Sequence, residues 1–338
     1  MPGCTRLSVI LFAGICAWNL HAQTTNPAGG ESWEQSVLRG QQLWNQGDYA
    51  GAEEVLRQAL REAGGAATED ARVAVTLTHL GSLYADEGRY AEAELLYQRS
   101  IPVLEKTRGD RDPALASALS SLAALWIETG RGEKAEPLLR RSLAIQEALG
   151  PDDPETAVTL NNLGSLYRLQ GKWAESERAL AEALRIFELR SGPRDPRTVE
   201  VLGNLGLLAQ DRGRYEEALS LADETLKVLE SCANPKPASM VRALNDEGVL
   251  HARLGRPDRA ERYLKRALAI GESALGPAHF AVAGILSNYA AVLRRLKRGG
   301  EAERLDQRAK LILKQSAETA LLDHTVSVGD LRKSKGRP

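Results

Sequence analysis

Residues 159–173 read TLNNLGSLYRLQGKW, and this stretch decides the fold. Its apolar positions recur at i, i+3 and i+7, which places them on one stripe of an α-helix. The closing triplet Gly171-Lys172-Trp173 returns in related form every 41 or 42 residues. The related corners are Gly47-Asp48-Tyr49, Gly88-Arg89-Tyr90, Gly130-Arg131-Gly132, Gly213-Arg214-Tyr215, Gly255-Arg256-Pro257 and Lys297-Arg298-Gly299. Self-similarity at this period is typical of a solenoid of stacked units.

Each period holds two helical patterns. After the corner comes a second apolar stripe, for example Ala135, Leu139 and Leu143, so each unit is predicted to be a helical hairpin. The connections between units, such as 150–154 (GPDDP), supply a Gly that can end one helix, an Asp that can cap the next and a Pro suited to its first turn. The residues that end and start helices therefore agree with the helix boundaries that the periodicity predicts.

The pattern of Leu163-Gly164, Tyr167, Gly171 and Trp173 resembles the tetratricopeptide repeat family, although Ser176 stands where that family usually has Ala. The long period, together with residues 149–154 (LGPDDP), resembles the kinesin-light-chain type. The resemblance covers roughly Trp33 to Ser316. It implies an all-α fold, a right-handed α-solenoid (superhelix) of about seven antiparallel helical hairpins over residues 33–316, whose first and last hairpins are degenerate.

The two ends of the chain differ from the repeats. Residues 1–22 have a basic start, a short apolar core and a small residue, Ala22, before Gln23, which indicates a secretory signal peptide. We therefore expect export to the periplasm or the outside after cleavage near Ala22, with no membrane span in the mature chain; an uncleaved membrane anchor is the alternative. Residues 23–32 are predicted to be a disordered linker, and residues 317–338 a polar, basic tail.

Composition excludes several functions. The formal net charge is −1, which provides no field for attracting nucleic acid. Of three cysteines only Cys232 lies beyond the predicted signal peptide, so no internal disulfide framework is expected in the mature chain. We find no phosphate-binding loop, zinc-ligand spacing or nucleophile elbow. The sequence thus predicts a non-enzymatic protein that needs no cofactor or metal.

The candidate binding surface lies opposite the Leu-Gly-Tyr stripe, on the side of each first helix that, as the resemblance implies, lines the concave face. An amide can donate to a main-chain carbonyl and accept from a main-chain N–H, so a row of them suits an extended polypeptide. Arg168 and Arg242 border the row and suit a partner's carboxylate. Polar residues on an exposed helix face need no ligand, and that alternative stays open. The predicted partner-binding residues are Asn162, Asn204, Asn245, Asn288, Arg168 and Arg242.

One unit departs from the pattern. Glu247 and His251 occupy the slots held by Leu163 and Tyr167, four residues apart on one helical face. We interpret them as a buried structural pair, because no third ligand for a metal has a recognisable spacing.

These observations predict a scaffold or adaptor that binds a protein or peptide along its concave groove. Two other classes stay open. One is a structural component of a cell-envelope assembly that packs through its convex face, and the other is an enzyme whose site has no recognisable motif.

Overall fold

The structure is a computed structural model that describes residues 32–65, 68–233 and 235–315. The predicted signal peptide, the C-terminal tail and all of the linker except Ser32 lie outside these residues. The described chain is all helical, with no strand. Its helices are α1 (Trp33–Asn45), α2 (Tyr49–Glu62), α3 (Ala71–Asp86), α4 (Tyr90–Arg108), α5 (Pro113–Glu128), α6 (Gly132–Leu149), α7 (Pro154–Leu169), α8 (Trp173–Ser191), α9 (Thr198–Asp211), α10 (Tyr215–Ser231), α11 (Pro237–Arg253), α12 (Pro257–Ala274), α13 (Phe280–Arg295) and a further helix over residues 299–315.

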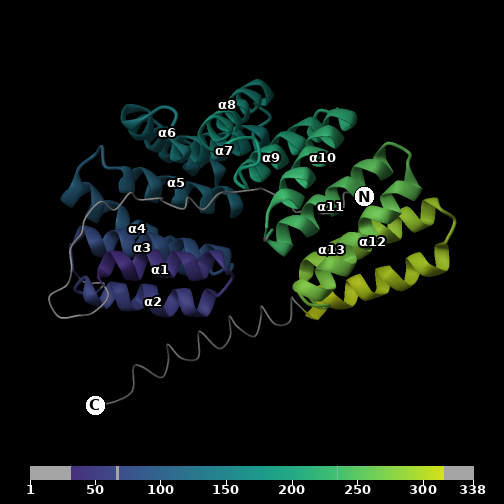
Figure 1. Ribbon diagram of the computed structural model, residues 1–338, viewed down its shortest axis with the longest axis horizontal. Helices are drawn as coiled ribbons and strands as arrows, with labels where there is room; N and C mark the ends of the chain where they lie inside the picture. Colours follow the sequence, from purple (N-terminus) through teal and green to yellow (C-terminus); the bar gives the residue numbers. More distant parts are fainter. Residues whose placement is uncertain (1–31, 66–67, 234, 316–338) are drawn as a thin grey trace, which may run out of the picture. The chain divides into compact units, whose positions relative to one another are not determined.

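Helices pair in chain order, as the period predicts. The odd-numbered helices begin the hairpins and are called first helices below; their partners are called second helices. Within each unit, second helices also pack on the first helix of the following hairpin, as α2 does on α3 and α12 does on α13 (Figure 1). The predicted all-α repeat of helical hairpins is confirmed.

The chain divides into two compact units, one ending at Asn204 and the other beginning at Leu205, inside α9. Unit 1 holds α1 to α8 with the start of α9. Unit 2 holds the rest of α9 and the helices that follow it. In unit 2, Ala209 of α9 packs with Ala218 of α10 and Leu250 of α11, so stacking continues after the boundary.

The helices end and begin where the glycine, aspartate and proline residues of the corners and connections predict. Gly171 has φ +73°, a conformation that costs glycine little, and the Lys172 N–H donates to the Tyr167 carbonyl at 2.9 Å to close α7. At the other end of α7, the Asp153 side chain accepts from the Glu155 N–H at 2.9 Å, and Pro154 occupies the first turn.

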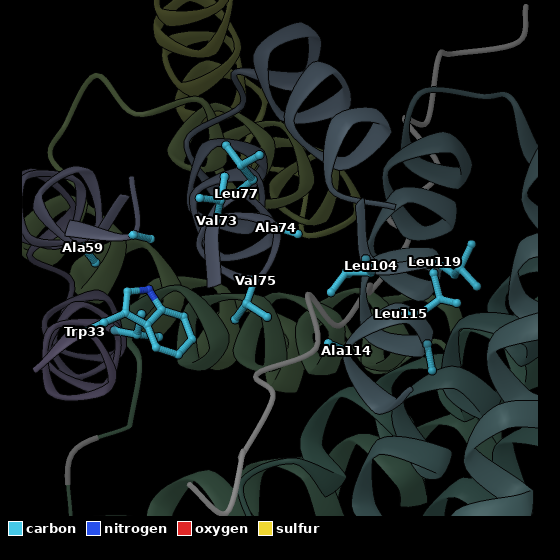
Figure 2. Packing of buried hydrophobic residues seen from close by; sticks show 14 of the residues in the cluster. Trp33, Ala59, Val73, Ala74, Val75, Leu77, Leu104, Ala114, Leu115 and Leu119 are labelled. Atoms are coloured by element: carbon cyan, nitrogen blue, oxygen red, sulfur yellow. The ribbon is translucent and has the colours of Figure 1, made fainter. Parts of the chain in front are cut away.

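The core of unit 1 is shared by successive hairpins. Figure 2 shows Trp33 of α1, Leu77 of α3, Leu104 of α4 and Leu115 of α5 in one buried cluster. The Trp33 indole also donates to Thr76 Oγ1 at 2.9 Å. Each such leucine contributes about 2 kcal/mol when fully buried. No hairpin encloses this core alone, which makes stacking a condition of folding.

Glycines in the first helices set the spacing within the hairpins. A Cβ added at Gly164 would lie 2.5 Å from Cγ of Leu180, sixteen residues later on the partner helix. The same offset joins Gly40 to Leu56, Gly81 to Tyr97 and Gly248 to Leu264. At Gly206 a Cβ would meet nothing closer than 3.9 Å, because the residue sixteen positions later is the small Ala222.

Candidate functional site

Polar residues follow one register on the first helices, and we call this set the first-helix row; it includes the predicted Asn162, Asn204, Asn245 and Asn288. Its members come from all seven first helices of the described chain and repeat at about the same step as the hairpins. They are Gln41, His79, Ser120, Asn161, Asn162, Asn204, Asn245 and Asn288.

In unit 1 the row makes hydrogen bonds from one hairpin to the next. Asn162 Nδ2 donates to Ser120 Oγ at 3.3 Å, and Asn204 Nδ2 donates to Asn161 Oδ1 at 2.9 Å. The three amides are fully buried. Because a buried amide needs a partner, these bonds couple the register of α5 to α7 and of α7 to α9.

The start of the row has the same geometry. Gln41 Nε2 and His79 Nδ1 lie 3.4 Å apart and join α1 to α3. Burial lowers the pKa of His79 to about 4, so the imidazole is neutral near pH 7. This contact therefore joins two uncharged side chains.

In unit 2 the row is more open. Asn288 Nδ2 donates to Asn245 Oδ1 at 2.9 Å, joining α13 to α11, and both residues are half-buried. Beside them, Asn245 Nδ2 lies 3.4 Å from Asp246 Oδ1. Burial raises the pKa of Asp246 to about 6, against the opposing effects of Arg242 and of the Asn245 hydrogen bond. This part of the row combines amides, a carboxyl and a guanidinium.

The structure separates the predicted site residues into two groups. Asn245, Asn288 and Arg242 are half-buried on neighbouring first helices. Asn162 and Asn204 are fully buried and Arg168 is 3% exposed, so the expectation that these three side chains lie open on the surface is wrong. For the two asparagines, the physical reason is the close approach of successive first helices, which places the amides within hydrogen-bonding distance of the preceding hairpin.

The Glu247 and His251 pair is buried in unit 2, with Glu247 Oε2 3.6 Å from His251 Nε2. Burial and the nearby Asp223 raise the pKa of Glu247 to about 8, while burial and neighbouring arginines lower the pKa of His251. The His251 ring also stacks on Tyr263, with centroids 5.2 Å apart. The shifts favour the uncharged form of both groups.

A second set of contacts between hairpins was not foreseen from the sequence, and we call it the corner clamp. At several corners, the glutamate six residues after the corner glycine pairs with the basic residue of the next corner; after Gly213 this position is Leu219. Glu94 pairs with Arg131 at 2.8 Å and also accepts from the Trp126 indole at 2.9 Å. In unit 2, Glu261 pairs with Arg298 at 2.7 Å and accepts from the Tyr289 hydroxyl at 2.9 Å. The signal in the sequence was a glutamate that stands six residues after most of the corner glycines.

The described residues hold no group of three or more His, Cys, Asp or Glu side chains placed to bind a metal ion. Among the helices of the same residues, none combines the length and apolar character required to cross a bilayer. Cys232, at the end of α10, is a half-buried thiol whose Sγ lies 3.3 Å from the Val228 carbonyl oxygen.

Comparison with known proteins identifies the family of this chain. The tetratricopeptide repeat family model matches residues 35–106, 72–148, 114–189, 155–231 and 239–315. The chain belongs to this family, whose members generally mediate protein–protein interactions on a fold that is typically not catalytic. No curated protein sequence matches the chain significantly.

Solved structures share the fold at low sequence identity. BtubC (BKLC) from P. vanneervenii is 22% identical, covers 73% of this chain and 94% of its own, and gives a TM-score of 0.53. A Podosopora anserina protein built of nearly identical TPR-like repeats of the kinesin-light-chain kind is 18% identical, with 61% and 98% coverage and a TM-score of 0.51. The Rap protein complexed with Competence and Sporulation Factor is 18% identical, with 85% and 76% coverage and a TM-score of 0.63. The neighbours include the kinesin-light-chain type predicted from the repeat length.

Proposed function

We propose that the protein is a non-enzymatic scaffold that binds an extended polypeptide along its first helices. The observation that supports this most directly is the half-buried group of Asn245, Asn288 and Arg242 on two neighbouring first helices of unit 2. The group offers amide donors and acceptors together with a cation, on a fold whose relatives bind proteins.

The proposed chemistry follows from the capacity of the amides. A carboxamide has two N–H donors and an oxygen that can accept two hydrogen bonds, so the bonds from Asn288 to Asn245 and from Asn245 to Asp246 leave capacity for a partner's main chain. Arg242 would pair with a carboxylate of that partner. Because α11 and α13 are already folded as helices, most of the ordering entropy of binding falls on the bound polypeptide.

In this proposal the buried members of the row have a supporting role. Asn162 and Asn204 hold neighbouring first helices in register through their bonds to Ser120 and Asn161. Arg168, at 3% exposure, is not assigned a partner contact. The proposal thus assigns partner binding to unit 2. In unit 1 the amides of the row are buried and bond to neighbouring first helices instead.

Site-specific photocrosslinking in cells that produce the full chain tests the proposal. A benzoylphenylalanine placed at Ser287, exposed beside Asn288, should crosslink to a discrete partner, and the triple change Asn245→Ala, Asn288→Ala and Arg242→Ala should abolish that crosslink. The matched control places the same probe at Glu224, exposed on the second helix α10. Crosslinks at Glu224 alone would instead favour the structural-assembly function through the outer face.

We also propose that residues 1–22 direct export. The basic start, short apolar core and small residue before Gln23 support this proposal. N-terminal sequencing of protein recovered from the producing cells should give Gln23 as the first residue. A chain that still begins at Met1 in the membrane fraction would support the retained anchor instead.

A further inference from the structure

The third residue of the corner triplet is aromatic in several hairpins. It is aromatic at Tyr49, Tyr90, Trp173 and Tyr215. The Tyr90 hydroxyl donates to Glu128 Oε1 at 3.0 Å, and the Tyr215 hydroxyl lies 3.4 Å from Arg253 Nη1. Both partners stand two residues before the next corner glycine. The corner aromatic side chain therefore lies against the end of the following first helix.

At the third corner this aromatic side chain is missing, because the position is Gly132. A cavity of about 780 Å³ lies there, in unit 1. A Cβ added at Gly132 would lie 2.9 Å from Cδ1 of Leu166, so the missing side chain would point toward the floor of this cavity. The lining residues are Tyr90, Ile127, Glu128, Thr129, Gly130, Gly132, Glu133, Leu166, Leu169 and Gln170.

The cavity walls differ from those of the filled corners. Leu169 stands two residues before Gly171, the place held by Glu128 and Arg253 in the other two units, so the polar partner of a tyrosine hydroxyl is replaced by an apolar side chain. Ile127 and Leu166 are buried and extend this apolar wall. A ring without a hydroxyl, or with its polar atom directed outward, suits this wall.

The rim of the cavity is acidic. Glu128 and Glu133 are both exposed, and within the described part of the chain neither is in an ion pair. Glu128 instead accepts the hydrogen bond from Tyr90. An occupant that carries a cation next to its ring would compensate this charge.

We propose that this corner cavity binds an aromatic side chain flanked by lysine or arginine in a polypeptide partner. The corners of Tyr90 and Tyr215 fill the equivalent place with their own ring, which shows that the surrounding backbone accepts one. The volume lies within the range of small-ligand pockets and accommodates a ring with parts of its neighbours. The site shares no residue with the Asn245, Asn288 and Arg242 group, so it is independent of the function proposed above.

Methyl NMR of the full chain with defined peptides tests the site. Ac-Lys-Trp-Lys-NH2 should give saturable shifts of the Leu166 and Leu169 methyl groups at millimolar concentration. Ac-Lys-Ala-Lys-NH2 and Ac-Glu-Trp-Glu-NH2 should bind at least about tenfold more weakly. No saturable shift, or equal binding of the three peptides, would overturn the proposal.

Two variants separate the site from nonspecific binding. Gly132→Trp supplies the missing ring from the chain itself and should abolish peptide binding; Gly132 starts α6 with an ordinary helical backbone, and the nearest obstacle is the flexible end of Leu166. The double change Glu128→Lys and Glu133→Lys leaves the cavity open and should reverse the preference between the lysine and glutamate peptides. Unchanged binding by either variant contradicts the proposal. Changing Asn245 and Asn288 to Ala should leave peptide binding here unaltered, which separates the two sites.

Discussion

At the scale of single residues, Glu247 is the group whose environment conflicts most with its chemistry. It is fully buried, lies near Asp223 and Asp246, and has a pKa of about 8 in the folded chain against an ordinary value of 4.5. The unfolded chain releases this proton near pH 4.5, whereas the folded chain keeps it until about pH 8. The contribution of Glu247 to the free energy of unfolding is therefore fully present below about pH 4.5, and it is lost as the pH rises to about 8.

Glu247→Gln removes this titration while keeping the shape of the side chain. The wild type should lose stability between pH 5 and pH 8 through the ionisation of Glu247, and the variant should not. We therefore expect the difference in free energy of unfolding, variant minus wild type, to increase by on the order of 2 kcal/mol over this pH range. Urea unfolding at several pH values measures it. His251, whose pKa is lowered, stays in both proteins, so its opposite contribution below pH 6.5 largely cancels in the comparison. Parallel pH profiles would show that Glu247 is not the titrating group.

Lys297 is a second residue under local strain. It occupies the place of the corner glycine in the last hairpin and has φ +60°, the only positive φ of a non-glycine residue in the described chain. Changing it to glycine should stabilise the protein by about 1 kcal/mol, because glycine adopts this conformation without steric cost. Thermal unfolding of Lys297→Gly and Lys297→Ala distinguishes this effect from the loss of the lysine charge, since the alanine variant should gain nothing.

At the scale of helices, the contact between Gly164 and Leu180 determines how closely α7 and α8 approach. Gly164→Ala should lower the free energy of unfolding by about 1 to 3 kcal/mol, because the new methyl group overpacks a contact that has no room for it. Gly206→Ala is the matched control, at the same register one repeat later, where space is available. It should stabilise the chain by up to about 1 kcal/mol through helix propensity. Equal effects of the two changes on denaturant unfolding would contradict this account.

How far the sequence predicts these elements depends on the range of the interaction. Corners and caps are local, and Gly171, Asp153 and Pro154 act as their positions in the sequence indicate. The bond from Asn204 to Asn161 joins residues 43 positions apart on separate helices, and its existence depends on how two helices approach. Burial of Asn161, Asn162 and Asn204 therefore could not be predicted. The glycine at position 132 was visible in the sequence, but the cavity beside it depends on Leu166 and Leu169 of the next hairpin.

At the scale of the whole molecule, packing inside each of the two units is sequential: hairpins contact their neighbours in the chain. A local perturbation should therefore fade along the chain. In hydrogen-exchange mass spectrometry, Gly164→Ala should speed exchange in α7 and α8 and, to a smaller extent, in α5 and α6. Exchange in α1 and α2 of the same unit should be unchanged. Faster exchange across all of unit 1 would mean that the unit unfolds as one cooperative block.

The corner clamp has a consequence for how such a chain can change in length. Glu94 meets Arg131 and Glu261 meets Arg298, so each clamp links a residue to one 37 positions later, across a single junction of the same design. An unequal genetic exchange that removes or duplicates one complete period would leave compatible partners on both sides of the splice. Events that insert or delete part of a period would separate them. Chains of this design can therefore lengthen or shorten by whole hairpins while the junctions that carry the clamp keep their ion pairs.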